Sequence, residues 1–298
     1  MSTRNKLHLA MVVLLIVGLL AVGCGNQATP TPEPEPTEAE AEAPTEAPTE
    51  APAEEEVQIS VAGSTTVQPL TESLAEAYAE EHPNVQIDVQ GGGSSVGVKS
   101  AGEGTVDIGQ ASREVKDSEK ETYPDLKIYT IARDGIAIAA HPDVSVDGLG
   151  KDEVRQIFAG EITNWSEVGG SDANITVVAR EEGSGTRGAF EDMVMGESVI
   201  ADTALLQPSN GAVKTTVSTT PNAIGFLSFG YLDESVKALA VEGAEPTVAN
   251  AVSGEYPVVR PLNMMTGGEP TGAVNDFLDF IMSEEGQKVV AEEYIPVQ

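Results

Sequence analysis

One local pattern recurs along this chain: an apolar strand, a turn of glycine and hydroxyl residues, and then a helix. The turns lie at residues 63–66 (Gly-Ser-Thr-Thr), 91–95 (Gly-Gly-Gly-Ser-Ser) and 183–186 (Gly-Ser-Gly-Thr). Each turn follows an apolar or alternating strand segment and opens a helical segment. Strands that alternate with helices over short connections are typical of parallel sheets with crossover helices. The chain is therefore predicted to be an α/β protein.

The N-terminus has the pattern of a targeting segment. Arg4 and Lys6 precede a nearly uninterrupted apolar run at residues 7–22, and Cys24 follows small residues. Because lipoprotein signals place their modified cysteine here, we expect residues 1–24 to be a lipoprotein signal segment with Cys24 lipidated. An uncleaved anchor helix is the alternative. Both place the rest of the chain outside the cytoplasm, and no disulfide can form because Cys24 is the sole cysteine.

Residues 25–56 are rich in Pro, Thr, Glu and Ala and contain no aromatic or large aliphatic residue. We predict a disordered, extended tether, because ordering this segment would bury nothing. The whole chain has 48 acidic and 16 basic residues, a net charge of −32. Without the ten glutamates of the tether and the two bases of the leader, 38 acidic and 14 basic residues remain. Such a surface repels polyanions, so no nucleic-acid partner is expected.

The three turns together predict an anion site. A helix N-terminus presents unpaired N–H groups and partial positive charge, hydroxyls add donors, and glycine allows close approach of a ligand. In an open parallel sheet such turns lie at the carboxyl ends of the strands, where ligands bind. One turn alone is usually a helix cap, but three of them and Arg180 point to a shared site. None has the Gly-Lys-Ser/Thr of a nucleotide P-loop, so a ligand smaller than a nucleotide is expected.

The chain resembles the phosphate-binding subunits of Pst-type ABC transporters. Residues 180–186 (Arg-Glu-Glu-Gly-Ser-Gly-Thr) match that family's Arg-x-acid-x-Ser-Gly-Thr motif. The resemblance covers nearly all of residues 57–298, and its supporting segments are residues 62–69, 93–99, 106–109 and 223–226. It implies a two-lobed periplasmic-binding-protein fold, in which helices flank a mainly parallel sheet in each lobe and two hinge crossovers join the lobes.

The resemblance also assigns roles to residues of the turns. Arg180 would fork onto two phosphate oxygens, and Glu182 would hold the Arg180 guanidinium in place. Ser112 would support the phosphate-binding residues without contacting phosphate itself. The expected hydrogen-bond donors to phosphate are Thr65, Thr66, Ser94, Ser184, Gly185 and Thr186.

One position departs from the best-known members, which carry an aspartate after the third strand to accept the proton of phosphate. This chain has Arg113 there, in a stretch one residue longer, as in a shorter branch of the family. We expect Asp134 to be the acceptor, with Glu114 as the second choice, and Arg113 to be a further phosphate donor. The alternatives are that Asp134 is a turn residue before glycine, and that Arg113 forms a surface ion pair with Glu114 or Asp117.

The acceptor bears on which anion is bound. Phosphate carries a proton near neutral pH, whereas sulfate carries none. A buried carboxylate accepts that proton but repels an oxyanion without one, and leaving such a group unpaired costs roughly 1–3 kcal/mol. Phosphate is therefore the expected ligand, with sulfate, molybdate or tungstate as alternatives.

No residue pattern favours catalysis or a metal. His82 and His141 each precede a proline and have no Cys or His partner at metal-binding spacing. Residues 183–185 lack the five-residue elbow of a serine hydrolase. We expect that the protein is not an enzyme and binds no cofactor. The alternative from another functional class is a phosphate-ester hydrolase.

The predicted lobes are discontinuous in sequence. Residues 57–133 and 258–298 are assigned to lobe I, and residues 134–257 to lobe II. Strands at residues 126–130 and 136–140 are expected to join at one hinge crossover. The predicted protein is a monomer, anchored by lipid at the extracytoplasmic face of the cell membrane, that delivers inorganic phosphate to an ABC permease.

Overall fold

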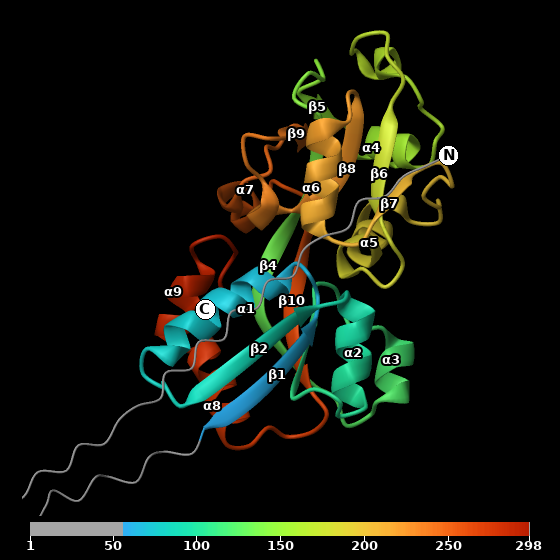
Figure 1. The fold of residues 1–298 in the computed structure, drawn as a ribbon. Coiled ribbons are helices and arrows are strands. Elements are labelled where there is room, and N and C mark those ends of the chain that lie inside the picture. Colours follow the sequence, from blue (N-terminus) through green and yellow to red (C-terminus); the bar gives the residue numbers. More distant parts are fainter. Residues whose placement is uncertain (1–55, 298) are drawn as a thin grey trace, which may run out of the picture. The chain divides into compact units, whose positions relative to one another are not determined.

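The structure is a computed structural model that describes residues 56–297. Elements from the two ends of this range form what we call the terminal lobe: β1 (Val57–Gly63), α1 (Val67–Ala79), β2 (Val85–Gly91), α2 (Ser94–Gly102), β3 (Ile108–Ala111), α3 (Asp117–Thr122), β10 (Val259–Thr266), α8 (Ala273–Met282) and α9 (Glu284–Val290). In Figure 1 these elements surround the lower ends of β4 and β10.

Elements from the middle of the range form the central lobe: β5 (Gly148–Leu149), α4 (Lys151–Phe158), η1 (Trp165–Val168), β6 (Thr176–Arg180), α5 (Gly185–Phe190), η2 (Glu191–Met195), β7 (Leu205–Gln207), α6 (Asn210–Thr219), β8 (Ala223–Ser228), η3 (Phe229–Tyr231), β9 (Lys237–Val241) and α7 (Val248–Ser253). The two-lobed α/β architecture agrees with the predicted fold class.

Strand β4 (Lys127–Ala140) runs through both lobes. The strands follow the order β2-β1-β3-β10-β4-β8-β6-β7, with β9 also on β4 and β5 on β9. The first half of β4 pairs antiparallel with β10 as far as Gly135, and the second half pairs with β8 from Ile136 onward. The expected break between two strands at residues 131–135 is therefore wrong. Pairing with β10 keeps this segment extended and overrides its Asp-Gly turn signal.

Each lobe has its own apolar core. In the terminal lobe, Leu70, Leu74 and Tyr78 lie on the buried face of α1, as their helical spacing predicts, and pack in one cluster with residues of β1 and α8. In the central lobe, a second cluster forms around strands β4, β6 and β8. Trp165 is buried there and donates from Nε1 to Asn222 O (3.0 Å).

The predicted signal segment 1–24, with Cys24, and the predicted tether, apart from Glu56, lie outside the described residues. Within residues 56–297, no helix has the length and apolar character needed to cross a bilayer.

Candidate functional site

The first turn presents hydroxyl groups at the start of α1. Ser64 Oγ accepts hydrogen bonds from the N–H groups of Thr66 (3.1 Å) and Val67 (3.4 Å), which a helix start leaves without intrahelical partners. Thr66 is fully buried. The hydroxyl of Thr65 is also buried, and it has no hydrogen-bond partner among the described residues. The turn therefore holds a donor that a ligand could use.

The second turn places Ser94 at the start of α2. Gly93 precedes it with a φ of +92°, a conformation that favours glycine. Ser94 is fully buried, and its Oγ accepts from the N–H of Ser112 (3.0 Å), which ties α2 to the end of β3. The next residue, Ser95, donates its N–H to Gly183 O of the third turn (3.1 Å). This bond joins the two lobes.

The third turn approaches both of the others. Ser184 caps α5 through its hydroxyl. A Cβ added at Gly185 would overlap Ser94 Oγ, so this close approach requires glycine. Thr186 Oγ1 lies 3.1 Å from Thr66 Oγ1. The three turns singled out from the sequence thus converge from both lobes.

Arg180 ends β6 beside these turns and is 2 % exposed. Two main-chain carbonyls hold its guanidinium: Nε donates to Gln207 O (3.2 Å) and Nη2 to Pro208 O (2.8 Å). Glu182 was expected to hold it but is exposed, and no hydrogen bond or ion pair joins it to Arg180 in residues 56–297. The physical reason is that β7 pairs in parallel with β6, so its end supplies carbonyl oxygens at this position.

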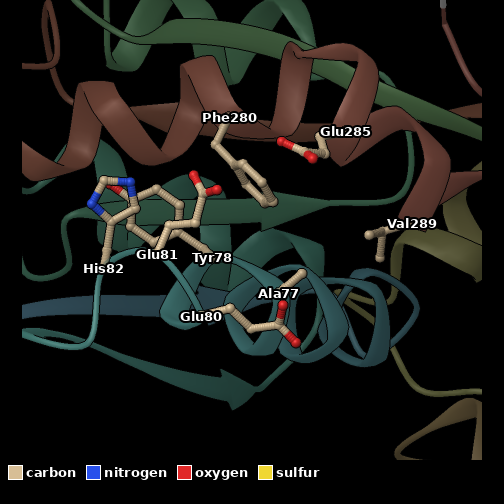
Figure 2. Close-up of a pocket in the computed structure, with 8 residues that line it drawn as sticks. All are labelled: Ala77, Tyr78, Glu80, Glu81, His82, Phe280, Glu285 and Val289. Carbon is tan, nitrogen blue, oxygen red and sulfur yellow. The ribbon is translucent and has the colours of Figure 1, made fainter.

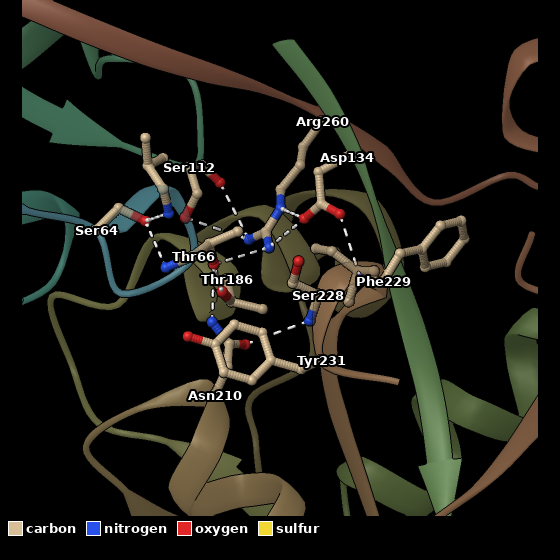
Figure 3. A network of polar contacts seen from close by, with 12 residues as sticks. Ser64, Thr66, Ser112, Asp134, Thr186, Asn210, Ser228, Phe229, Tyr231 and Arg260 are labelled. Atoms are coloured by element: carbon tan, nitrogen blue, oxygen red, sulfur yellow. Dashed lines mark hydrogen bonds and ion pairs between the residues drawn. The ribbon is translucent and has the colours of Figure 1, made fainter. Parts of the chain in front are cut away.

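A second guanidinium, from Arg260 of β10, lies at the centre of the polar network in Figure 3. Its Nε and Nη2 both donate to Asp134 Oδ2, at 3.1 and 2.8 Å. Nη2 also donates to Thr66 Oγ1 (3.2 Å), and Nη1 donates to Ser112 O (3.1 Å). Arg260 therefore connects the strands that run between the lobes with the first turn and the end of β3.

Asp134 lies on β4 and is 1 % exposed. Its other oxygen, Oδ1, accepts from the N–H of Phe229 (3.3 Å). Burial raises the pKa of the Asp134 carboxyl, and the Arg260 guanidinium opposes that shift. Glu114, the second candidate acceptor, is exposed. Of the two candidates, only Asp134 belongs to the network.

The buried charges of this network do not cancel. Arg180, Arg260 and Asp134 carry a net charge of +1 with Asp134 ionised and +2 with it protonated. Burial, with a further contribution from Arg260, lowers the pKa of Arg180 to about 10. An uncompensated buried charge is costly in free energy, and an anion placed beside it relieves that cost. In both protonation states of Asp134, the interior therefore suits an anion.

Arg113 does not belong to this network, although it is 3 % exposed. Its Nη1 and Nη2 donate to the two carboxylate oxygens of Glu119, at 2.8 and 2.7 Å. Nη1 also donates to Glu114 O, and Nη2 to Ser95 Oγ. The structure thus differs from the expectation of a further phosphate donor, because Glu119 at the start of α3 takes both guanidinium ends. The alternative of a surface ion pair with Glu114 or Asp117 is wrong as well, because Arg113 is buried and its ion-pair partner is Glu119.

Reasoning from the sequence missed five residues that Figure 3 labels, and the side chains of three of them reach the first turn: Arg260, Asn210 and Tyr231. Asn210 Nδ2 donates to Thr66 Oγ1 (2.8 Å), and Tyr231 OH donates to Thr65 O (2.8 Å), so both reach the first turn from the central lobe. The available signal for Arg260 was a single charge inside an apolar strand segment. The signal for Asn210 was its place directly after the Ser209 helix cap.

A separate pocket of about 120 Å³ lies between the end of α1 and helices α8 and α9 (Figure 2). Tyr78 and His82 stack in its wall with ring centroids 4.1 Å apart. The other polar side chains that line it are the carboxylates of Glu80, Glu81 and Glu285. Carboxylates repel an oxyanion, so this pocket is not the candidate anion site.

The turns provide hydrogen-bond donors, Arg180 and Arg260 provide guanidinium groups, and Asp134 provides a carboxylate acceptor. Together these groups are suited to binding a ligand. Within the described range, no cluster of three or more His, Cys, Asp or Glu side chains is placed to hold a metal ion.

Comparison with known proteins identifies the family. A family model for the PBP superfamily domain matches residues 42–285. The phosphate-binding protein PstS of Bacillus subtilis (strain 168) is 39 % identical over 220 residues, which cover 73 % of this chain and 73 % of that protein. The chain belongs to the Pst-type phosphate-binding proteins.

Solved structures of other Pst-type proteins agree with the fold. A phosphate ABC transporter substrate-binding protein from Clostridium perfringens, solved with bound phosphate, is 42 % identical with a TM-score of 0.78, covering 81 % of this chain and 100 % of that chain. An ABC-type phosphate transport receptor from Vibrio cholerae is 38 % identical with a TM-score of 0.67, covering 80 % and 99 %. As a Pst-type protein, this chain is a binding protein and not an enzyme, in agreement with the prediction.

Proposed function

We propose that this chain is an extracytoplasmic lipoprotein that captures inorganic phosphate between its two lobes and delivers it to an ABC permease. The observation that carries the proposal is the buried excess of positive charge, with Arg180 and Arg260 set against Asp134. The relatives support phosphate as the anion, because they are named phosphate-binding proteins and one was solved with phosphate bound.

We assign the phosphate to the space where the three turns meet Arg180. The guanidinium of Arg180 neutralises charge on the anion, and Arg260 adds to the positive potential. The turns add neutral donors that replace water around the anion. These donors are the hydroxyls of Thr65, Thr66, Ser94, Ser184 and Thr186 and the main-chain N–H of Gly185, with Ser112 behind them.

We assign the proton of phosphate to Asp134. Its two oxygens accept three hydrogen bonds in total, two from Arg260 and one from Phe229. A carboxylate has about four acceptor positions, so one remains for a phosphate hydroxyl. An oxyanion without a proton would leave that position unpaired next to its own negative charge. This difference favours phosphate over sulfate.

Titration calorimetry with four anions tests the ligand. Phosphate and arsenate, which both carry a proton near neutral pH, are expected to bind tightly and to compete with each other. Sulfate and molybdate are expected to give no heat of binding. Sulfate binding as tight as that of phosphate would refute the role of Asp134, and the absence of phosphate binding would refute the proposed function.

Phosphate capture requires the lobes to separate and close. We propose boundaries at residues 133/134 and 257/258, so that both crossovers lie within β4 and just before β10. Register supports a boundary near this position, because β4 leaves β10 and joins β8 two residues later, between Gly135 and Ile136. A transporter can then distinguish the closed, phosphate-bound form from the open form. We propose that the protein acts as a monomer.

The anchor is proposed from the sequence alone. We propose that residues 1–24 are a lipoprotein signal, that Cys24 carries the lipid, and that residues 25–56 are the tether. Labelling of cells with a radioactive fatty acid is expected to mark the protein in the membrane fraction. Cys24→Ala should abolish the label and leave phosphate binding unchanged. A labelled Cys24→Ala protein would contradict the assignment.

A further inference from the structure

A hollow of about 380 Å³ lies between the lobes, next to the candidate anion site. The terminal lobe contributes the start of α2, Arg113 and Lys116, and the central lobe contributes the third turn, α5 and η2. The hydrogen bond from Ser95 N to Gly183 O joins the lobes at two residues that line it. Ser184 belongs both to this hollow and to the converging turns. The hollow therefore adjoins the place assigned to phosphate.

The charges around this hollow differ from those of the chain as a whole. Three basic residues line it, Arg113, Lys116 and Arg187, with only two acidic residues, Glu182 and Glu191. In residues 57–298, by contrast, 38 acidic residues outnumber 14 basic ones. An anion that approaches this molecule is repelled over most of the surface, and the repulsion is weakest where the acidic excess is interrupted.

Two of the three basic residues are already neutralised by partners. Arg113 is paired with Glu119, and Arg187 Nε donates to Glu191 Oε1 at 2.7 Å. Lys116 is exposed and forms no ion pair within residues 56–297; the nearby Glu119 carboxylate interacts with it electrostatically but is already held by both guanidinium ends of Arg113. Its charge therefore acts outward, over the roughly 8–10 Å that physiological salt permits.

We propose that this hollow is the mouth through which a small tetrahedral oxyanion reaches the inner site, and that Lys116 is its steering charge. The proposal rests on the proposed function, since it requires the inner site to bind phosphate. In this role Lys116 accelerates the encounter and holds the anion only transiently. The inner donors, led by Arg180, account for the retention of the anion.

The test is the association rate of radiolabelled inorganic phosphate, measured by rapid mixing and filtration at low and high salt. Lys116→Glu is expected to slow association about fivefold at low salt, because it places a repelling charge at the mouth. Lys116→Gln should show a smaller loss in the same direction. At about 1 M salt, where screening acts within about 3 Å, the rates should converge with that of the unaltered protein.

The matched control is Lys288→Glu. Lys288 is an exposed residue of α9 whose side chain is 70 % accessible and pairs with Glu284 at 3.0 Å; it does not line the hollow, and the change alters the net charge by the same amount. Its association rate should stay within about 1.5-fold of the unaltered protein. Thermal denaturation of all variants verifies folding.

Two results would overturn the steering role while leaving the proposed function intact. One is an unchanged rate for Lys116→Glu, and the other is an equal loss for Lys288→Glu, each in proteins that still bind phosphate at equilibrium. An unaltered protein that binds no phosphate at equilibrium would instead overturn both proposals.

Discussion

Two polar regions of this protein hold three charged groups each, in opposite settings. One region contains the guanidinium groups of Arg180 and Arg260 and the carboxylate of Asp134, all at least 98 % buried, and Figure 3 shows Arg260 with Asp134. The pocket of Figure 2 contains Glu80, Glu81 and Glu285, all exposed. Water and salt screen the exposed charges, whereas the buried ones act on each other and on a ligand almost unscreened. The sign of the charges and their burial, more than their number, therefore decide where an anion is bound.

The largest effect is expected from separating the buried ion pair. Arg260→Met leaves the carboxylate of Asp134 buried without its partner, which should lower the free energy of unfolding by about 3–5 kcal/mol. Replacing both partners, by Arg260→Met with Asp134→Asn, should recover most of that loss, since no lone charge remains. Urea denaturation measures both. A double variant no more stable than the single one would show that the loss arises from packing and not from charge.

Arg180 is held by main-chain carbonyls and not by a carboxylate, so its removal should weaken phosphate binding more than it lowers the stability of the fold. Arg180→Ala is expected to weaken phosphate binding at least about a hundredfold, which corresponds to roughly 3 kcal/mol. Calorimetry measures the affinity. Arg155→Ala, at a partly exposed arginine of the central lobe, is the control and should bind like the unaltered protein. Phosphate binding by Arg180→Ala at full affinity would remove this residue from the site.

The close approach of the third turn to Ser94 and Ser112 can be tested at Gly185. A methyl group added there meets Ser94 Oγ and lies 2.6 Å from Ser112 Oγ, so Gly185→Ala should keep the lobes from closing fully. We expect about tenfold weaker phosphate binding, or about 1.4 kcal/mol, at nearly unchanged stability. Gly268→Ala, where the added group meets open space, should have no effect. Equal affinities for the two variants would contradict the close approach of the turns.

The pH dependence of phosphate affinity tests whether Arg180 must be charged to bind the anion. Bound phosphate favours the charged guanidinium, so its pKa is higher in the complex than in the free protein, where it is about 10. The contribution of the charged Arg180 guanidinium to phosphate affinity is therefore fully present well below pH 10 and is lost as the pH rises through 10. Calorimetry between pH 8 and 10.5, with circular dichroism to verify folding, should show a severalfold weakening only at the upper end. A constant affinity throughout would mean that Arg180 stays fully charged in the free protein.

The smallest effect is expected in the exposed pocket. Glu285→Gln removes one of its three carboxylate charges, yet those charges are screened, and the pocket lies at the end of α1 opposite the first turn. Phosphate affinity should change less than about 1.5-fold. A change as large as that of Gly185→Ala would show that exposed charge matters as much as buried charge here.

The turns of the site were predictable from the sequence because their cause is local. A turn of glycine and hydroxyl residues after a strand can open a helix wherever the strand lies. Parallel pairing of β1 with β2 brings the first two turns to one edge, and the third turn meets them from the other lobe, after β6. Arg260, Asn210 and Tyr231 could not be found in this way, because distant strands and helices bring them to the first turn. For the same reason the support of Arg180 was misassigned: the motif suggested Glu182, but neighbouring β7 supplies the carbonyls. The single long β4 was missed because its middle is held extended by β10, a partner about 130 residues later.

The unbroken β4 has a mechanical consequence for the protein. A strand that keeps its extended backbone on both sides of Asp134 can bend through small torsion changes shared among several residues, without melting a turn or helix. Opening then leaves the regular backbone pairing of each lobe in place. Because the carboxylate that we assign to the ligand's proton lies at the proposed lobe boundary, the same movement that admits a new ion would also shift the group that selects it.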